Sequence, residues 1–396
     1  MILGGDQAAG NRTAQILSIV VFNAITYFLI GLPLAVFPGL VHLTLGYSAA
    51  LAGGVISLQY VATLLTRSLV GRISDQRGAK VTVLAGLVCA ALNGVCILAG
   101  GLCHGPLAVL GWLLLSRLWL GAAESGTGTG CITWGIGRFG GAATAEVISW
   151  NGVSSYGGIA AGAPAGVALM QWGGLPALAG VAIILPLLGL VGAAFSKAAA
   201  PLAGARRMSM LSVAREIAPY GLALAGGSFG FGVIVAFMAL YYAAHGWQGA
   251  AYALTGFGAC FVAVRIVLAG AIGRFGGFRA ALVSFVIEMA GLLLLWLAPV
   301  KLVALLGAAL AGLGFSLIFP ALAVEALRSV APGSRGAAIA IYTVFLDVAL
   351  GLTGPVAGAV GGHFGYPAVF FAGALVVSGA LALTFRLRNM VLARGI

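Results

Sequence analysis

The sequence contains, between two long apolar stretches, the charged segment Gly71-Arg72-Ile73-Ser74-Asp75-Gln76-Arg77-Gly78-Ala79-Lys80. The flanking stretches 47–70 and 81–101 hold one charged residue, Arg67. Each is long enough for a transmembrane helix, which needs about 20 apolar residues. The segment is therefore expected to be a loop between two membrane-spanning helices.

The composition of the whole chain agrees with a membrane location. Of its 396 residues 62% are apolar and 7% are charged, against roughly 25% charged residues in a soluble domain. Long unbroken apolar runs favour helices over the alternating strands of a membrane barrel. A helix with its connection takes roughly 33 residues, which predicts twelve spans: 14–41, 47–70, 81–101, 107–129, 143–170, 175–195, 217–243, 248–270, 280–299, 302–326, 337–360 and 367–387.

The basic residues predict the orientation of these spans. Nearly all of them fall in the even-numbered loops and at the two termini, and Lys301 alone falls in an odd-numbered loop. By the positive-inside rule both termini are cytoplasmic, in a multi-pass protein of the cytoplasmic (inner) membrane. The net charge of +12 is then an orientation signal, and no nucleic-acid partner is expected.

The loop segment has a second copy. Gly270–Arg279 repeats the spacing of glycine, charged residue, glycine and cation at an offset of 199, and Pro164 and Pro355 echo each other at an offset of 191. The chain is therefore expected to form two six-helix halves, residues 1–196 and 217–396, joined by a cytoplasmic linker at 197–216. Parallel repeats of this kind occur in transporters that rock one half against the other.

These motifs resemble those of the major facilitator superfamily. Gly71–Lys80 matches its loop signature, Arg117–Gly121 its fourth-helix signature, and Gly158–Gly166 a variant of the signature of proton-coupled exporters. The whole chain is similar to the YhhS/YfcJ-type, arabinose-efflux-like exporters. The resemblance implies an all-α membrane fold of two pseudo-symmetric six-helix bundles, alternating access, a monomer, and a proton gradient in place of a cofactor.

The resemblance also assigns two groups of residues to the mechanics of the transporter. Asp75 would meet the N-terminus of span eleven near Gly336, where a helix dipole favours an anion; Arg274 replaces this acid in the second copy. The gating motif comprises Gly71, Arg72, Asp75, Gly78, Lys80, Gly270, Arg274, Gly277 and Arg279. The antiporter-motif residues, expected to pack span five against span eight or eleven, are Gly158, Gly162, Pro164, Gly166, Gly354 and Pro355.

Charged residues inside spans are costly and are default functional candidates. Arg117 and Glu124 lie seven residues apart on one face of span four, and Asp347 lies among apolar neighbours in span eleven. A desolvated carboxyl group favours its neutral form, which makes Asp347 a proton-coupling candidate, and Glu124 is a second. The resemblance adds Arg117, as a residue that positions a carboxylate or takes part in proton coupling. The alternative for each is a structural ion pair or hydrogen bond. Glu288, on a helix that is peripheral in the superfamily, is expected to have a structural partner.

Polar and aromatic residues on the helices that line the superfamily's central cavity are the candidates for substrate contact. They are Asn23, Tyr27, Gln59, Tyr60, Trp150, Asn151, Tyr156 and Tyr241. The alternative for these residues is interhelical hydrogen bonding or anchoring at the membrane interface, which suits Tyr241 and Tyr242 especially.

Motifs for enzymes, nucleotide loops and paired-cysteine metal sites are absent from the sequence, so neither an enzyme nor a metal site is expected. The sequence predicts a secondary transporter that exports a small polar organic solute by proton antiport. An uptake symporter or facilitator on the same fold is one alternative, and a non-transporting receptor or scaffold is another. The sequence does not name the solute.

Overall fold

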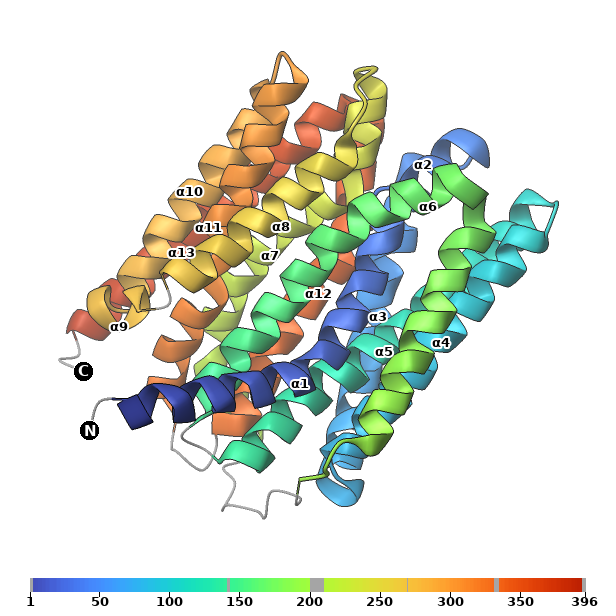
Figure 1. Cartoon of the computed structure of the whole chain (residues 1–396). Helices are drawn as coiled ribbons and strands as arrows, with labels where there is room; N and C mark the ends of the chain where they lie inside the picture. Colours follow the sequence, from blue (N-terminus) through green and yellow to red (C-terminus); the bar gives the residue numbers. More distant parts are fainter. Residues whose placement is uncertain (1–2, 141–142, 200–209, 269, 331–334, 394–396) are drawn as a thin grey trace. The chain divides into compact units, whose positions relative to one another are not determined.

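The computed structural model describes residues 3–140, 143–199, 210–268, 270–330 and 335–393 (Figure 1). The described part of the chain is helical. Its elements are α1 (Leu3–Leu34), α2 (Phe37–Gly39), the π-helix η1 (Leu40–Thr44), α3 (Ala49–Arg77), α4 (Ala79–Leu102), α5 (Pro106–Phe139), α6 (Thr144–Phe195), α7 (Met210–Ala244), α8 (Ala250–Val267), α9 (Ala271–Phe275), α10 (Gly277–Leu297), α11 (Lys301–Arg328), α12 (Arg335–Phe364) and α13 (Tyr366–Ala393).

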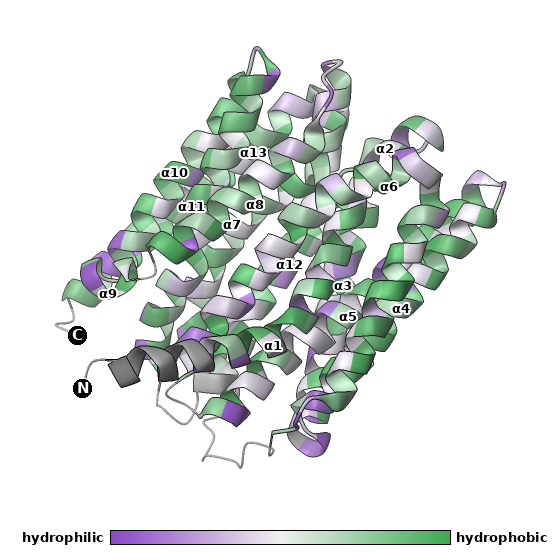
Figure 2. Ribbon diagram, in the orientation of Figure 1, coloured by the Kyte–Doolittle hydropathy of each residue, from purple (hydrophilic) through white to green (hydrophobic). Residues whose placement is uncertain are grey.

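Eleven helices in the described ranges are long and apolar enough to cross a membrane. Figure 2 shows hydrophobic residues along most of the length of these helices and hydrophilic residues gathered at α9. The longest, α6, has 52 residues and is interrupted at Gly173 and Gly174, which are not helical. A straight helix of that length would measure ~78 Å, against a hydrocarbon core of ~30 Å. The interruption therefore divides α6 into two spans, and the twelve-span helical fold is confirmed.

The chain separates into two compact units, which are described one at a time. Unit 1 comprises residues 1–33 and 62–203, and unit 2 comprises residues 34–61 and 204–396. The first part of α3 thus belongs to unit 2 and the second part to unit 1. Residues 200–209 of the predicted linker lie outside the described residues.

Small residues set the helix packing in unit 1. Gly86 of α4 lies directly against Gly126 of α5, so that a methyl group at Gly126 would be 2.9 Å from the Cα of Gly86. Gly162 of α6 meets Gly31 and the carbonyl oxygen of Phe28 on α1 in the same way. Close backbone approach is the usual basis of helix association in lipid, where apolar burial between helices contributes little.

Unit 2 uses the same kind of contact between α10 and α11. Gly291 of α10 lies against the backbone of Gly307 and Ala311. Gly312 of α11 lies against the backbone of Phe257 on α8. Both pairs, α4–α5 and α10–α11, thus pack through glycines that let the two backbones approach closely.

The starts of α4 and α10 fix the register of the repeat. Gly78 precedes α4 with φ of +92°, and Gly276 precedes α10 with φ of +84°. This backbone region is strained for residues with a side chain and is the reason for glycine there. Gly78 therefore corresponds to Gly276 and not, as the sequence spacing predicted, to Gly277, so the structural offset at this point is 198.

Candidate functional site

Glu124 of α5 is the centre of a polar cluster in unit 1. Its side chain is 5% exposed. The hydroxyl group of Tyr27 on α1 donates to Oε1 at 3.0 Å, and the hydroxyl group of Thr63 on α3 lies 3.1 Å from Oε2. Two helices, α1 and α3, thus present hydroxyl groups to one buried carboxyl group on α5.

Asn23 continues the cluster one helical turn before Tyr27. Its Nδ2 lies 2.9 Å from the hydroxyl oxygens of both Ser154 and Ser155 on α6 and 3.3 Å from the carbonyl oxygen of Asn151. The amide group thus ties α1 to α6, while its other polar atom, Oδ1, faces Gly128 of α5.

Two acceptor atoms of this cluster are buried without a hydrogen-bond donor in the described part of the chain. They are Oδ1 of Asn23 and Oδ1 of Asn151. Glu124 and Gly128 are one turn apart on α5, as are Tyr27 and Asn23 on α1, so the backbone positions of the two groups differ by about one helical turn along their helices, ~6 Å. Buried acceptors normally have partners, and the donor groups of a solute would fit these two.

The structure therefore brings together four of the predicted site residues: Asn23, Tyr27, Glu124 and Asn151. Arg117 is also buried on α5, at 1% exposure, and lies ~10 Å along the helix from Glu124. Asp347, at 1% exposure on α12, belongs to unit 2, as do the buried side chains of Gln59 and Tyr60.

Three predicted cavity residues have different surroundings. Trp150 packs on an apolar cluster of Ile16, Val20, Ala143 and Val147. The hydroxyl group of Tyr241 donates to the carbonyl oxygen of Leu295 at 2.8 Å, and its ring lies against Trp247 and Phe370. The contact with Leu295 is an interhelical hydrogen bond, which agrees with that alternative for Tyr241. Tyr156 is half-buried on α6, one residue beyond Ser155.

Ser57 inserts its hydroxyl group into the backbone of α12 near Asp347. It accepts from the N–H of Gly354 at 2.8 Å and donates to the carbonyl oxygen of Leu350 at 2.9 Å. These two backbone groups are one i to i−4 pair of the helix, and Pro355 follows directly. A side chain inserted in the hydrogen-bond ladder and a proline are both recognised causes of helix kinks. Within unit 2, Ser57 of α3 thus contacts the turn of α12 that follows Asp347.

The glycines of the exporter-type signature contact a different helix from the one that the sequence predicts. Gly158, Gly162 and Gly166 lie against the backbone of α1 at Ala24, Phe28 and Leu32. The sequence predicted packing on span eight or eleven, which is wrong for these three faces. Gly354, from the second echo, lies against Gly53 and Ser57 of α3. Spacing by four creates a smooth helix face, but it does not identify the helix that the face meets.

The predicted gating residues of unit 1 lie at a helix end. Lys80 donates to the carbonyl oxygens of Ala194 and Ser196, both at 2.7 Å, and so caps the C-terminus of α6. A cation there is favoured by the helix dipole. The side chain of Asp75, and residues 331–337 near its predicted partner, lie outside the described side chains.

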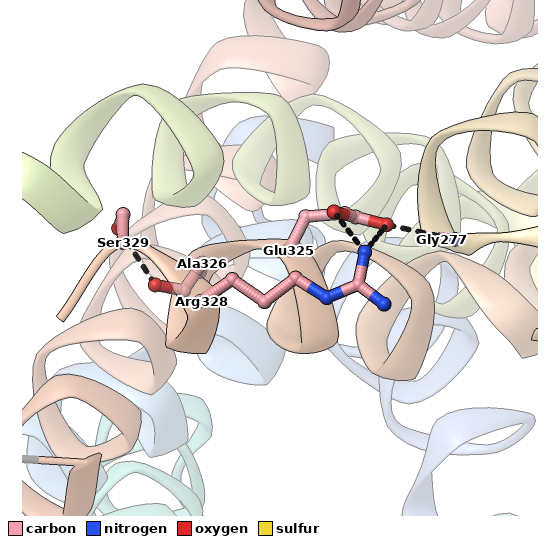
Figure 3. A network of polar contacts seen from close by, with 5 residues as sticks. All are labelled: Gly277, Glu325, Ala326, Arg328 and Ser329. Carbon is pink, nitrogen blue, oxygen red and sulfur yellow. Dashed lines mark hydrogen bonds and ion pairs between the residues drawn. The ribbon is translucent and has the colours of Figure 1, made fainter. Parts of the chain in front are cut away.

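At the corresponding end of unit 2, a carboxylate caps the start of a helix. Glu325 of α11 accepts from the N–H of Gly277 at 2.8 Å and pairs with Arg328 at 3.0 Å (Figure 3). The acid therefore caps the first turn of α10, where unpaired N–H groups attract an anion. Arg274 and Arg279 are exposed.

Sequence reasoning missed three residues of the cluster around Glu124: Thr63, Ser154 and Ser155. A signal existed for Thr63, which follows Gln59 by one helical turn, and for the serines, which follow Asn151 by three and four residues. Small hydroxyl residues are common in membrane helices, so this signal did not separate them from packing residues.

A membrane-spanning helical fold of two repeats, with small-residue packing and a buried polar cluster, is the architecture of membrane transporters built from helical repeats. No protein-family model matches the chain. Curated relatives do. An uncharacterized MFS-type transporter of Burkholderia mallei (strain SAVP1) is 52% identical over 379 residues, covering 96% of this chain and 93% of the relative. Another, of Pseudomonas aeruginosa (strain LESB58), is 48% identical over 385 residues, covering 97% and 96%.

Two solved structures share the fold. The human organic anion transporter MFSD10 (TETRAN) has a TM-score of 0.69 at 17% identity, over 93% of this chain and 99% of that chain. The nucleoside transporter NupG, as a D323A mutant, has a TM-score of 0.72 at 14% identity, over 95% and 99%. Together with the relatives, these findings give the family: the chain belongs to the MFS-type transporters, of the major facilitator superfamily. It is a multi-pass membrane transporter and not an enzyme.

Proposed function

We propose that this transporter exports a small polar organic solute in exchange for protons, by alternating access of the two halves 1–196 and 217–396. It acts as a monomer in the inner membrane with both termini cytoplasmic, an orientation supported by the distribution of basic residues. The proposal includes its kinship with the YhhS/YfcJ-type exporters.

The cluster around Glu124 is the observation that carries the proposal. A carboxylate inside a membrane protein marks an ion or substrate pathway. The hydroxyl group of Tyr27 donates to this carboxylate, and that of Thr63 lies 3.1 Å from its Oε2 and 3.1 Å from the carbonyl oxygen of Gly121. When a proton binds Oε2, that oxygen becomes a donor, and the hydroxyl group of Thr63 can accept from it while donating to the carbonyl oxygen of Gly121. Proton binding is thereby linked to the contact between α3 and α5.

The unfilled acceptors support a solute with hydrogen-bond donors. Oδ1 of Asn23 and Oδ1 of Asn151 would accept from hydroxyl or amino groups. The two structural neighbours are named for organic anions and nucleosides, which are polar organic molecules, and a solute of comparable polarity is proposed here.

Asp347 is proposed as the second proton-coupling group. It lies one turn before Leu350, where Ser57 contacts the backbone of α12. Loading and release of a proton at Asp347 would act next to the turn of α12 that Ser57 contacts. In the proposed cycle solute binds from the cytoplasm, the halves rock, external protons load Asp347 or Glu124, and the return step releases them inside. Arg117 positions the solute or modulates the charge of the acids.

The test begins with identification of the solute. Purified protein is screened by thermal shift against sugars, phosphonates, organic acids and metal-chelating metabolites. Everted membrane vesicles are then energised so that their interior becomes acidic, and they should accumulate the stabilising compound until an uncoupler is added. Accumulation that is unaffected by the uncoupler contradicts proton antiport. If no compound of any of these classes stabilises the protein, the result supports the receptor or scaffold alternative.

A further inference from the structure

Glu288, on α10 of unit 2, lies outside the proposed transport site and has an unusual environment. Its side chain is fully buried, and neither carboxylate oxygen has a hydrogen-bond partner among the described residues. The sequence predicted a structural partner for this acid. The described part of unit 2 offers none, so that prediction is wrong.

The carboxyl group lies against a glycine face of α7. A methyl group at Gly230 would be 2.5 Å from Oε1, and one at Gly227 would be 3.2 Å from Oε2. Around the same two glycines lie Phe285, Ile318 and Val377. The acid is therefore enclosed by apolar side chains and by the bare backbone of α7, where only glycine leaves room for it.

On the helices that pack around Glu288, the charged and titratable groups are distant from its carboxyl group. They lie seven or more residues along their helices from the contact point, ~10 Å or further. On α7, α10, α11 and α13 the nearest are Tyr220, Tyr241, Arg279, Lys301, Glu325, Tyr366 and Arg386. Arg265, on α8, contacts α11 but donates to the carbonyl oxygen of Ser316.

The packing of the fold does not require an acid at this position. The glycines that begin α4 and α10 relate the two repeats by 198 residues, which places Ala90 of α4 where α10 has Glu288. Ala90 is fully buried. One repeat thus makes the equivalent helix contacts with a methyl group, and the carboxyl group in the other needs a different explanation.

We propose that Glu288 is a proton-binding site of unit 2, whose carboxyl group holds its proton while α7, α10 and α11 are packed as in this structure and releases it to water only when α7 separates from α10. An isolated ionised carboxylate is strongly disfavoured away from water, whereas the neutral acid is tolerated. The packed arrangement binds one more proton than an opened one, so low pH favours packing and rising pH favours opening.

The first experiment reads the protonation state directly, without any transport assay. Infrared spectra of the purified full chain are recorded at pH 7 in an ester-free detergent, because lipid esters absorb near carboxylic acids. The wild type should show a carboxylic acid band that Glu288→Gln diminishes and Glu146→Gln leaves intact. Glu146 is the matched control because it is paired with Arg12 at 2.6 Å and partly exposed. A band unchanged by Glu288→Gln overturns the proposal.

The second experiment reads the opening of α7 from α10. Hydrogen exchange of peptides covering 224–235 and 284–292 is compared between wild type and Glu288→Gln at the same pH, so that the intrinsic pH dependence cancels. The ratio of wild-type to variant exchange should rise with pH, by up to about tenfold per unit. Equal exchange at every pH contradicts the proposal.

Gly230→Ala provides a second route if Glu288→Gln does not fold. Its methyl group would displace Oε1, so the carboxylic band should weaken in a folded protein, and a full-strength band contradicts the proposal. Both readouts remain valid if transport proves independent of protons, so failure of the proposed function and failure of this inference can be told apart.

Discussion

Glu124 accepts one hydrogen bond from Tyr27 and lies beside the hydroxyl group of Thr63. A glutamine at this position would keep the shape of the side chain but could not bind or release a proton. We therefore expect Glu124→Gln to fold normally, with a melting temperature within a few degrees of the wild type, and to lose proton-driven transport by at least tenfold. Glu146→Gln removes an acid that is paired with Arg12 near a helix end and should retain transport. Equal transport by both variants would show that Glu124 is not a coupling group.

The hydroxyl groups of Tyr27 and Thr63 should each contribute to the transport rate. A hydrogen bond to a charged group contributes about 1.5–3 kcal/mol, so Tyr27→Phe should reduce the transport rate roughly tenfold to a hundredfold. Thr63→Val, which keeps the shape of the side chain, should act in the same direction. Initial rates in vesicles measure both effects. If neither variant differs from the wild type, the hydroxyl groups are packing features only.

At the scale of single elements, the contact between Ser57 and α12 makes a specific prediction. Ser57→Ala removes the inserted hydroxyl group and allows the N–H of Gly354 to pair with the carbonyl oxygen of Leu350. α12 should become more regular there, with slower hydrogen exchange around 350–356 and transport slowed about fivefold, corresponding to about 1 kcal/mol. Ser228→Ala is the control, since Ser228 bonds only to Leu224 of its own helix in the described contacts. Faster exchange in α12 after Ser57→Ala would contradict the role of Ser57 as an insertion that weakens the helix.

The glycine face of α6 can be tested by two substitutions on one helix. Gly162→Ala would overlap the backbone of Phe28, whereas Gly180→Ala meets nothing within 4 Å. Overpacking costs typically 1–3 kcal/mol, so Gly162→Ala should lower the melting temperature by several degrees. Gly180→Ala should leave it unchanged or raise it slightly, since alanine favours helix more than glycine. Equal melting temperatures would mean that α1 and α6 do not approach as closely as described.

At the scale of the whole molecule, the sequence predicted the number of spans and the repeat because both depend on local hydropathy and spacing. The break at Gly173–Gly174 followed from length alone. Contacts between distant helices could not be predicted in this way. The pairing of Tyr27 with Glu124, the capping of α6 by Lys80 and the face of α1 that meets Gly162 depend on helix rotation, which hydropathy leaves undetermined when a helix is apolar all round. For the same reason Glu288 was expected to have a partner.

The central claim is that solute and protons move in opposite directions through this protein. Purified transporter is reconstituted in proteoliposomes that enclose a pH-sensitive dye, and a compound identified by the thermal-shift screen is added outside. The account predicts that entry of the compound makes the interior more alkaline, because protons leave in exchange, and that Glu124→Gln and Asp347→Asn abolish this change. Acidification of the interior on entry of the compound, or entry without any change in pH, would contradict it.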